Sequence, residues 1–415
     1  MTLPNNTKDI KVSDKLIDQI IGQEQAVDIV KLAARQRRFL LIVGEPGTGK
    51  SMLGRALAEL MPYQQVDNIV ALPNTLDNTQ PFIKSMSCEE SEELLEKTLK
   101  QNRSQKSSTQ FIFSSAIIAT IIVTTVQVIR GQGYSYVLGG LVVCVILMFL
   151  KNYLMQKSGL SLPKILANRK KNHSVPFIDA TGTHQGGLFG DVRHDPYQSG
   201  GAESPNHQLL EAGAIHRAHK GVLFIDEMST LNKESQQNLL TAIQQKELAI
   251  TGRSAGSSGT MVHTAPVPCN FTLVLAGNDE DLENLHPALR SRIQGFGYEI
   301  YTQSLIDDNE NNQLKLAQFI AQEIQRDGKI PHFSKSGIEA IIAEARRRSG
   351  KVGSLTARFR ELGGLVRAAG DLAIQENKEF VDAELVNTAL PIARSLEDQK
   401  FHRTADSISP LSQNK

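Results

Sequence analysis

Two long uncharged stretches stand out in the pattern of hydrophobic and polar positions along the chain. Residues 111–129 and 134–150 contain no charged side chain and are mostly apolar. As helices they would reach roughly 28 and 25 Å, close to the thickness of the hydrocarbon core of a bilayer. Because only residues 130–133 separate them, we predict a tight transmembrane hairpin. The alternative is a pair of buried core helices.

Positive charge gathers at both flanks of this pair, whereas the turn holds Arg130 alone. The flanking cations are Lys97, Lys100, Arg103, Lys106, Lys151, Lys157, Lys164, Arg169, Lys170 and Lys171. By the positive-inside rule, both ends of the hairpin face the cytoplasm. Residues 1–25 are polar and mixed in charge, unlike a signal peptide. We therefore expect a multi-pass protein of the cell membrane that crosses the lipid bilayer twice, with its termini and its bulk in the cytoplasm.

Three shorter apolar runs, residues 39–43, 222–225 and 271–276, predict buried parallel strands. The first run leads into GEPGTGKS and then into a helical stretch, which is the context that a P-loop requires. The glycines of such a loop allow backbone N–H groups to surround phosphates. The predicted ATP-binding residues are Gly44, Glu45, Pro46, Gly47, Thr48, Gly49, Lys50 and Ser51. Among them, Lys50 is expected on the β- and γ-phosphates and Ser51 on Mg²⁺.

Polar residues follow the second and third runs, where the strands are expected to end. Asp226 is predicted to bind Mg²⁺, and Glu227 to polarise the attacking water. Asn278 could orient that water, or it could merely begin a turn. Further along, Arg292 is a candidate arginine finger on the γ-phosphate of a neighbouring subunit, with Arg290 as the alternative.

Composition narrows the class of protein. A chain of 415 residues, 40% of them hydrophobic, predicts two or three ordinary globular domains. Lys and Arg number 45 against 44 Asp and Glu, so no overall basic excess indicates a nucleic-acid partner, and we expect none. Three scattered cysteines exclude a disulfide scaffold.

The order of these motifs resembles that of AAA+ ATPases, and their details resemble the archaeal-type, membrane-anchored Lon protease, LonB. The segments that carry the resemblance are 21–26, 44–51, 187–195, 211–227, 286–293 and 362–373. It covers about residues 15–395 and includes the apolar pair inserted between the two nucleotide motifs. The resemblance implies an α/β fold: an AAA+ P-loop NTPase core, whose parallel sheet is flanked by helices, with an inserted two-helix transmembrane hairpin and a C-terminal all-α lid.

The resemblance also implies roles for residues outside the P-loop. Gly22 and Gln23 would belong to the N-terminal strip that packs on adenine. Leu188 and Phe189, beside glycines, would form a pore loop that grips unfolded protein, although Phe189 could instead fill the core. Residues 250–261 resemble a second axial loop. The family arrangement implies a homo-oligomer, a ring of six.

Helical periodicity dominates from residue 335 onwards, as expected for the lid. A helix that opens near residue 354 could place an arginine on the nucleotide as sensor 2, for which we favour Arg358 over Arg360. The expected divisions are 1–84 and 173–305 for the two parts of the core, 85–172 for a polar linker and the hairpin, 306–396 for the lid, and 397–415 for a polar tail.

Lon-type proteases continue after the lid into a domain with a Ser–Lys dyad, whereas here only a short polar tail follows. We therefore expect ATP hydrolysis from this chain, and proteolysis only with a Lon-type peptidase domain or subunit in trans. Truncation, a split gene and a motor that never cuts remain open. The expected function is an unfoldase of a Lon-type serine protease system for misfolded or membrane proteins. The alternative is a non-proteolytic, chelatase-like assembly factor at the membrane.

Overall fold

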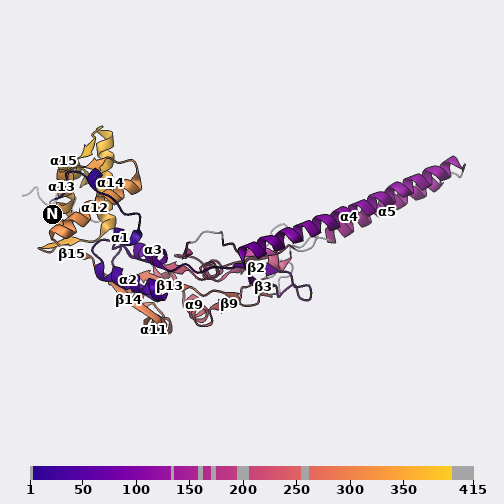
Figure 1. The fold of residues 1–415 in the computed structure, drawn as a ribbon, viewed down its shortest axis with the longest axis horizontal. Coiled ribbons are helices and arrows are strands. Elements are labelled where there is room, and N and C mark those ends of the chain that lie inside the picture. The colour runs from indigo at the N-terminus through magenta and orange to yellow at the C-terminus, as the bar shows by residue number, and fades with distance from the viewer. Residues whose placement is uncertain are drawn as a thin grey trace, which may run out of the picture.

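The computed structural model describes residues 3–131, 135–157, 162–169, 174–193, 205–253 and 261–394. Along its longest axis, a helical lid lies at one end, a mixed α/β core follows, and a long pair of helices projects at the other end (Figure 1). Most of the predicted axial loop at residues 250–261 and the whole tail at 397–415 lie outside the described residues.

A five-stranded parallel sheet forms the centre of the core, which confirms the predicted α/β fold. Its strands, in spatial order, are β14 (Gly297–Thr302), β1 (Phe39–Gly44), β13 (Thr272–Gly277), β8 (Val222–Ile225) and β5 (Phe177–Asp179). Strand β1 lies between β13 and β14, with Leu41 opposite Leu275 and Glu299. Because all the strands run in one direction, the polar residues that follow β1, β8 and β13 meet at one edge.

Helices cover both faces of this sheet, which explains why its strands are apolar on both sides. One face packs on α2 (Glu24–Gln36) and α3 (Lys50–Leu60), and the other packs on α9 (Lys233–Gln245) and α11 (Pro287–Phe296). Gly54 lets α3 approach β8 closely, because a Cβ there would lie 2.6 Å from the ring of Phe224. The start of α3 is thereby held beside the end of β8.

The projecting pair of helices grows out of a small antiparallel sheet of β3 (Phe82–Met86), β2 (Asn68–Leu72) and β4 (Lys164–Ala167). Helix α4 (Cys88–Ile129) begins at a capping box, in which Ser87 and Glu90 satisfy each other's backbone N–H groups. It packs along α5 (Ser135–Lys157). Both helices are long and apolar enough to cross a membrane. Of the 18-residue apolar stretch in each helix, only 6% and 0% is buried. Burial as core helices is therefore not observed.

The domain divisions expected from the sequence do not coincide with element ends. Strand β3 crosses residue 84, and residues 88–110, expected in a linker, form the first half of α4. Strand β4 lies in the range 85–172 expected for the linker and hairpin, but it pairs with β2, which lies in the range expected for the core. The continuous helix forms because its polar first half is rich in good helix formers and is capped at Ser87.

The lid consists of α12 (Glu310–Asp327), α13 (Lys335–Ser349), α14 (Phe359–Gln375) and α15 (Ala383–Ala389) around one apolar cluster. Asn309, Ser334 and Asp382 cap three of these helices through their side chains. Two short pairings brace them, β15 (Leu305–Asp307) with β17 (Ser354–Thr356) and β16 (His332–Phe333) with β18 (Phe380–Val381). The N-terminal segment with η1 (Thr7–Asp9) also packs on the lid.

Short elements complete the described fold. They are α1 (Leu16–Gln19), α6 (Gln185–Phe189), β6 (Asp191–Val192), α7 (Asn206–Leu209), β7 (Leu210–Glu211), α8 (Ala214–Arg217), η2 (Met228–Thr230), β9 (Glu247–Leu248), β10 (Thr251–Arg253), β11 (Met261–His263), β12 (Val267–Pro268) and α10 (Asp279–Glu283).

Candidate nucleotide site

A cavity of about 430 Å³ lies where the sheet edge, the N-terminal strip (residues 19–23) and the lid meet. The core contributes the loop before α3 and the ends of β8 and β13, and the lid contributes α12 and α14. Its lining residues are Gln19, Ile20, Ile21, Pro46, Gly47, Thr48, Gly49, Lys50, Ser51, Met52, Asp226, Glu227, Gly277, Asn278, Asp281, Phe319, Gln322, Glu323, Arg326, Phe359, Arg360 and Arg367. Six of the eight predicted P-loop residues are among them.

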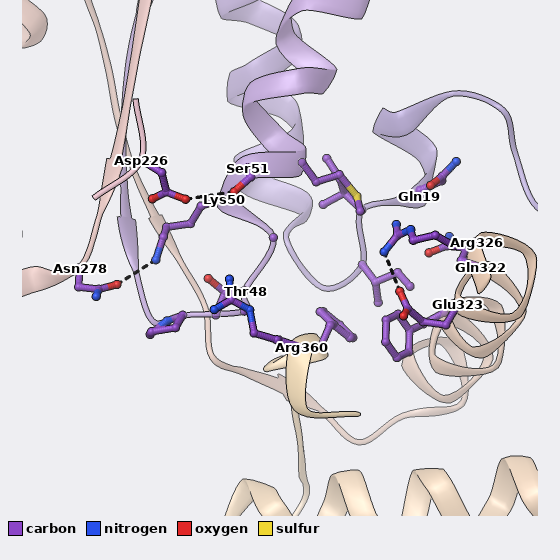
Figure 2. A pocket seen from close by; sticks show the side chains of 18 of the residues that line it. Gln19, Thr48, Lys50, Ser51, Asp226, Asn278, Gln322, Glu323, Arg326 and Arg360 are labelled. Atoms are coloured by element: carbon purple, nitrogen blue, oxygen red, sulfur yellow. Dashed lines mark hydrogen bonds and ion pairs between the residues drawn. The ribbon is translucent and has the colours of Figure 1, made fainter. Parts of the chain in front are cut away.

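Lys50 lies at the centre of the end formed by the P-loop, which we call the phosphate end. Its Nζ donates to the carbonyls of Gly44 at 2.6 Å and Glu45 at 3.1 Å, and to Oδ1 of Asn278 at 3.0 Å (Figure 2). The side chain is buried, and burial lowers the pKa of Lys50, while the charges of Asp226 and Asp281 oppose that shift. A partly desolvated ammonium attracts phosphate oxygens strongly, and a bound phosphate would replace one or more of these three acceptors.

Ser51 and Asp226 form the second pair at the phosphate end. The Ser51 hydroxyl donates to Oδ2 of Asp226 at 3.1 Å, although 175 positions separate them. A hydroxyl and a carboxylate are oxygen ligands of the kind that Mg²⁺ binds together with substrate phosphates. No group of three or more His, Cys, Asp and Glu side chains that could hold a metal occurs among the described residues. The pair therefore fits a magnesium ion that takes its remaining ligands from phosphate and water.

Glu227 lies beside this pair in an uncommon backbone conformation. Its φ of 50° is in the left-handed region, and its N–H donates to Oδ1 of Asp226 at 2.9 Å. Such a conformation in a non-glycine residue costs energy and is often found at functional sites. The residue lines the cavity and is exposed to it, as required of a group that contacts water.

The opposite end of the cavity, which we call the lid end, is built mostly by residues outside the sequence motifs. Gln19 and Ile21 come from the N-terminal strip, and Phe319, Gln322 and Glu323 come from α12. In Figure 2, Gln19, Gln322 and Glu323 lie across the cavity from Lys50 and Asn278. Glu323 is only 5% exposed and pairs with Arg326 at 2.7 Å and with Arg367 of α14. These ion pairs fix α12 against α14 at the wall of the cavity.

The two sensor-2 candidates lie on different sides of the start of α14. Arg358 precedes the helix and pairs with Glu45; this contact raises the pKa of Arg358 and lowers that of Glu45. Arg358 is absent from the cavity lining, whereas Arg360 is part of it. Arg360 lies so close to Gly47 that a Cβ on that glycine would approach Arg360 Cβ to 2.9 Å. The structure thus brings Arg360 to the site, rather than the favoured Arg358.

Gly22 and Gln23 do not line the cavity either. The buried Gln23 side chain donates to the carbonyl of Gln303 at 2.7 Å and accepts from its N–H at 3.0 Å. Gly22, with φ 68°, packs against Ile306. These two residues tie the N-terminal strip to the base of the lid, whereas the preceding residues Gln19, Ile20 and Ile21 line the cavity. The predicted contact of Gly22 and Gln23 with adenine stays a prediction.

Two further P-loop residues, Gly44 and Glu45, contribute through their carbonyls to Lys50 rather than as lining. Thr48 is buried, and its hydroxyl lies 2.8 Å from the Glu45 carbonyl and 2.7 Å from the Thr302 hydroxyl. It therefore anchors the loop to β14. These contacts hold the phosphate end in shape.

The candidate arginine fingers lie outside the cavity of their own chain. Arg290 pairs with Glu299 at 3.3 Å, and the Arg292 guanidinium lies 4.2 Å from the centroid of the Phe296 ring. Neither lines the cavity. This placement agrees with a role on a neighbouring subunit, which stays a prediction.

The predicted pore loop differs from expectation. Leu188 is fully buried and Phe189 is 7% exposed, both within α6 and packed in the core cluster with Ile215 and Leu223. The idea that they protrude as an apolar grip is wrong for this structure, and the alternative that Phe189 fills the core is confirmed. The reason is that α6 packs on α8, which gives both side chains an apolar environment.

Comparison with known proteins adds family information. Residues 173–290 match the family model described as LonB-like, AAA domain, and residues 332–394 match Archaeal LonB, AAA+ ATPase LID domain. Residues 16–101 match Magnesium chelatase, subunit ChlI.

Curated relatives extend these matches to nearly the whole chain. The archaeal Lon proteases of Thermococcus kodakarensis and Archaeoglobus fulgidus are 47% and 48% identical over 95% of this chain, but over 61% and 63% of their own length. The chain thus spans about three fifths of those relatives. A Lon protease homologue of Methanothermobacter thermautotrophicus is 34% identical over 96% of this chain and 91% of that protein.

One solved structure illustrates the fold comparison. NtrX from Brucella abortus in complex with ADP has a TM-score of 0.43 at 12% identity, covering 95% of this chain and 59% of that chain. This likeness is too weak to support a functional conclusion.

Proposed function

The chain belongs to the archaeal Lon protease (LonB) family and carries its AAA+ ATPase region, and from this premise we propose that it hydrolyses ATP in the cavity between core and lid. The single observation that carries the proposal is the convergence of Lys50, Asn278, Ser51 and Asp226 at the phosphate end. These residues come from three sequence segments and form the set that phosphoryl transfer to water requires.

Each residue of the phosphate end has a proposed task. Lys50 binds the β- and γ-phosphates, and Asn278 orients the Lys50 ammonium through the hydrogen bond already present. Glu227 accepts a hydrogen bond from the attacking water. Ser51 and Asp226 would hold Mg²⁺, which, when bound, neutralises charge on the phosphates. Arg360, next to Gly47, adds positive charge from the lid side.

The ring assembly is tested by mixing two inactive variants. In a homo-oligomeric ring, proposed to have six subunits, Arg292 acts on the nucleotide of the next subunit. Arg292→Ala and Lys50→Ala chains should each be inactive alone, yet regain part of the ATPase activity when mixed. Arg290→Ala is the matched control and should stay active, because that side chain pairs with Glu299. Full activity of Arg292→Ala alone would contradict the assignment.

Helices α4 and α5 are proposed to anchor the chain in a lipid bilayer, with the core on the cytoplasmic side. The support is their length and their exposed apolar surface: Phe111, Leu138 and Phe149 are each more than two thirds exposed. Each such side chain gains on the order of 1.5–3 kcal/mol on leaving water. The chain should remain in the membrane pellet after alkaline carbonate washing, whereas release by the wash would contradict the anchor.

The work of ATP hydrolysis is proposed to act on misfolded or membrane proteins, which are unfolded and passed on. Their cleavage is proposed only together with a Lon-type serine peptidase, present as a domain or as a subunit in trans. An unfolded protein should stimulate ATP turnover by the detergent-solubilised chain. A rate of ATP hydrolysis that does not change when unfolded protein is added would contradict this substrate class.

A second candidate is a non-proteolytic remodelling factor, favoured by the match of residues 16–101 to a magnesium chelatase subunit. That match covers the N-terminal strip, the P-loop and strands β2 and β3 of the small sheet, but not the lid or residues 173–290. The same stimulation assay separates the two candidates, because a remodelling factor responds to its folded partner rather than to unfolded protein.

A further inference from the structure

Charge is sharply segregated along the chain around the pair of helices α4 and α5. No Asp or Glu occurs between Glu96 and Asp179, whereas Lys and Arg recur throughout that stretch. Within α4, every carboxylate lies before residue 97, on the side of the core, and every cation lies between residue 97 and the apolar stretch that begins at Phe111. The cations of α4 therefore lie closer to the proposed membrane span than any of its acids.

The two cations nearest to the core are compensated within α4. Lys97 pairs with Glu93 at 2.6 Å. Lys100 pairs with Glu96 at 3.5 Å. At 1.5 Å per residue, Lys97 and Lys100 lie about 21 and 16 Å before Phe111 along the helix. The polar layer of a bilayer is roughly 5–7 Å thick on each side, so both ion pairs lie beyond it.

Three cations beside the apolar stretches remain uncompensated, and we call Arg103, Lys106 and Lys151 the cationic collar. Arg103 and Lys106 are exposed, and Lys151 is half-buried. Within the described parts of the chain, none of the three forms an ion pair. Lys106 and Arg103 lie about 7.5 and 12 Å before Phe111 along the helix. Lys151 directly follows the second apolar stretch, which ends at residue 150.

The three residues of the cationic collar belong to the same end of the helix pair. Helices α4 and α5 pack along each other (Figure 1) and run in opposite directions, because only a short segment joins them. Gly140 of α5 packs against the side chain of Thr124 of α4. Lys151 is eleven residues after Gly140, which places it level with the residue eleven positions before Thr124, residue 113. Lys151 thus lies at the start of the first apolar stretch, the end at which Arg103 and Lys106 also lie.

We propose that the cationic collar binds the phosphate groups of anionic lipids. This inference rests on the proposed membrane anchor and adds the class of lipid that the anchor prefers. Each Lys or Arg near an anionic leaflet strengthens binding by roughly 5-fold, and the long side chains extend along the helix to reach the headgroups. A zwitterionic headgroup gains less, because it carries its own cation beside the phosphate.

The chain contains no tryptophan, so a single introduced one reports on the lipids around it. Phe149→Trp changes a side chain of α5 that is 74% exposed, two residues before Lys151. In vesicles of the full chain, lipids with brominated acyl chains quench tryptophan fluorescence. Comparing brominated phosphatidylglycerol with brominated phosphatidylcholine gives the ratio of their binding constants at the helix surface. We expect a ratio of about 5 in favour of phosphatidylglycerol at 0.1 M NaCl.

Neutralising the cationic collar should remove this preference. The collar variant carries Arg103→Gln, Lys106→Gln and Lys151→Gln in the Phe149→Trp background, and its ratio should fall to about 1. The matched control carries Lys97→Gln and Lys100→Gln in the same background. Its ratio should stay near 5, because these two cations are paired and distant from the bilayer.

A salt titration tests the same charges without any substitution in the collar. The ratio of the Phe149→Trp protein should fall toward 1 at 1 M NaCl, because the Debye length shrinks from about 10 Å to about 3 Å. This measurement decides the question if the collar variant alone does not insert into vesicles. Insertion is read from quenching by brominated phosphatidylcholine, which should be equal in all three proteins.

Three results would each overturn the inference: a ratio of about 1 with the collar intact, a ratio that does not change with salt, or equal ratios in the collar variant and the matched control. A different result refutes the membrane anchor itself. In that case, neither brominated lipid would quench the introduced tryptophan in any of the proteins.

Discussion

The two ends of the cavity are built in different ways. At the phosphate end, Lys50 donates hydrogen bonds to the carbonyls of Gly44 and Glu45, within its own loop, and to Asn278, which follows strand β13. At the lid end, Gln19 and Gln322 line the same cavity although about three hundred positions separate them, and the helices that carry them contain no motif.

The difference reflects what each end must bind. Phosphate needs backbone N–H groups, a cation and a metal ligand in fixed order, which limits the sequence to a recognisable pattern. A base needs a flat apolar slot and one or two hydrogen bonds, which many side chains can supply. Changes at the phosphate end should therefore abolish activity, and changes at the lid end should tune it.

Replacing Lys50 should have the largest effect. Lys50→Ala removes the only P-loop ammonium, so we expect ATP turnover to fall by about 1,000-fold, because phosphate charge is then uncompensated. Steady-state phosphate release measures this. Lys31→Ala, which removes an exposed lysine paired with Asp28 at 3.3 Å, should change turnover little. Similar effects of the two substitutions would remove the basis for the phosphate end.

Glu227→Gln should separate binding from chemistry. The amide keeps the shape of the side chain but cannot accept a proton, so turnover should drop about 100-fold while ATP affinity is retained. Turnover and nucleotide titration together measure the split. Glu280→Gln, on exposed α10, is the control. Loss of affinity without loss of turnover would argue against the role of Glu227.

Acid should weaken the core that carries the phosphate end. His216 is fully buried; its Nδ1 lies 3.2 Å from the N–H of Gly213, from which it accepts, and its Nε2 lies 3.0 Å from the Leu248 carbonyl. This arrangement needs the neutral ring, and burial lowers the pKa of His216 from 6.5 to about 4. The unfolded chain thus takes up the proton first, so stability is complete above pH 6.5 and is lost as the pH falls toward 4.

At pH 5 the expected loss from His216 is about 2 kcal/mol. Thermal unfolding at pH 7 and pH 5 measures it, and the difference should shrink in His216→Gln. His263→Gln, at an exposed position, should leave the difference unchanged. An equal pH dependence in all three proteins would show that His216 is not the responsible group.

The smallest expected effect lies at the boundary of the two ends. Arg360→Ala should lower ATP turnover or affinity by about 10-fold, because Arg360 lines the cavity beside Gly47. Arg358→Ala should change little, since its exposed pairing with Glu45 is solvated. Both are measured by steady-state kinetics. A reversed order would restore Arg358 as the sensor and contradict the geometry of α14.

The sequence was sufficient to predict the residues whose spacing is fixed by phosphate and metal binding. Lys50, Ser51, Asp226 and Asn278 follow apolar runs that became adjacent parallel strands, so their meeting follows from the topology. The apolar pair also became two helices, because nothing in residues 111–129 interrupts a helix.

Other residues depend on details that no local pattern contains. Arg358 and Arg360 differ by two positions, and only the start of α14 at Phe359 decides which one faces the cavity. Phe189 lies beside glycines, as a protruding residue would, yet the packing of α6 on α8 buries it. Gln322 is one of many helical glutamines, and its place in the cavity wall is visible only after α12 is placed against the N-terminal strip.

A cryo-EM map of the chain with Mg²⁺ and a non-hydrolysable ATP analogue would test the central claim most directly. The account predicts one nucleotide per chain, with phosphate density against Gly47 to Ser51 and the base at the lid end of the cavity. Density for the nucleotide elsewhere, or phosphates bound at the P-loop with the base pointing into solvent, would contradict it.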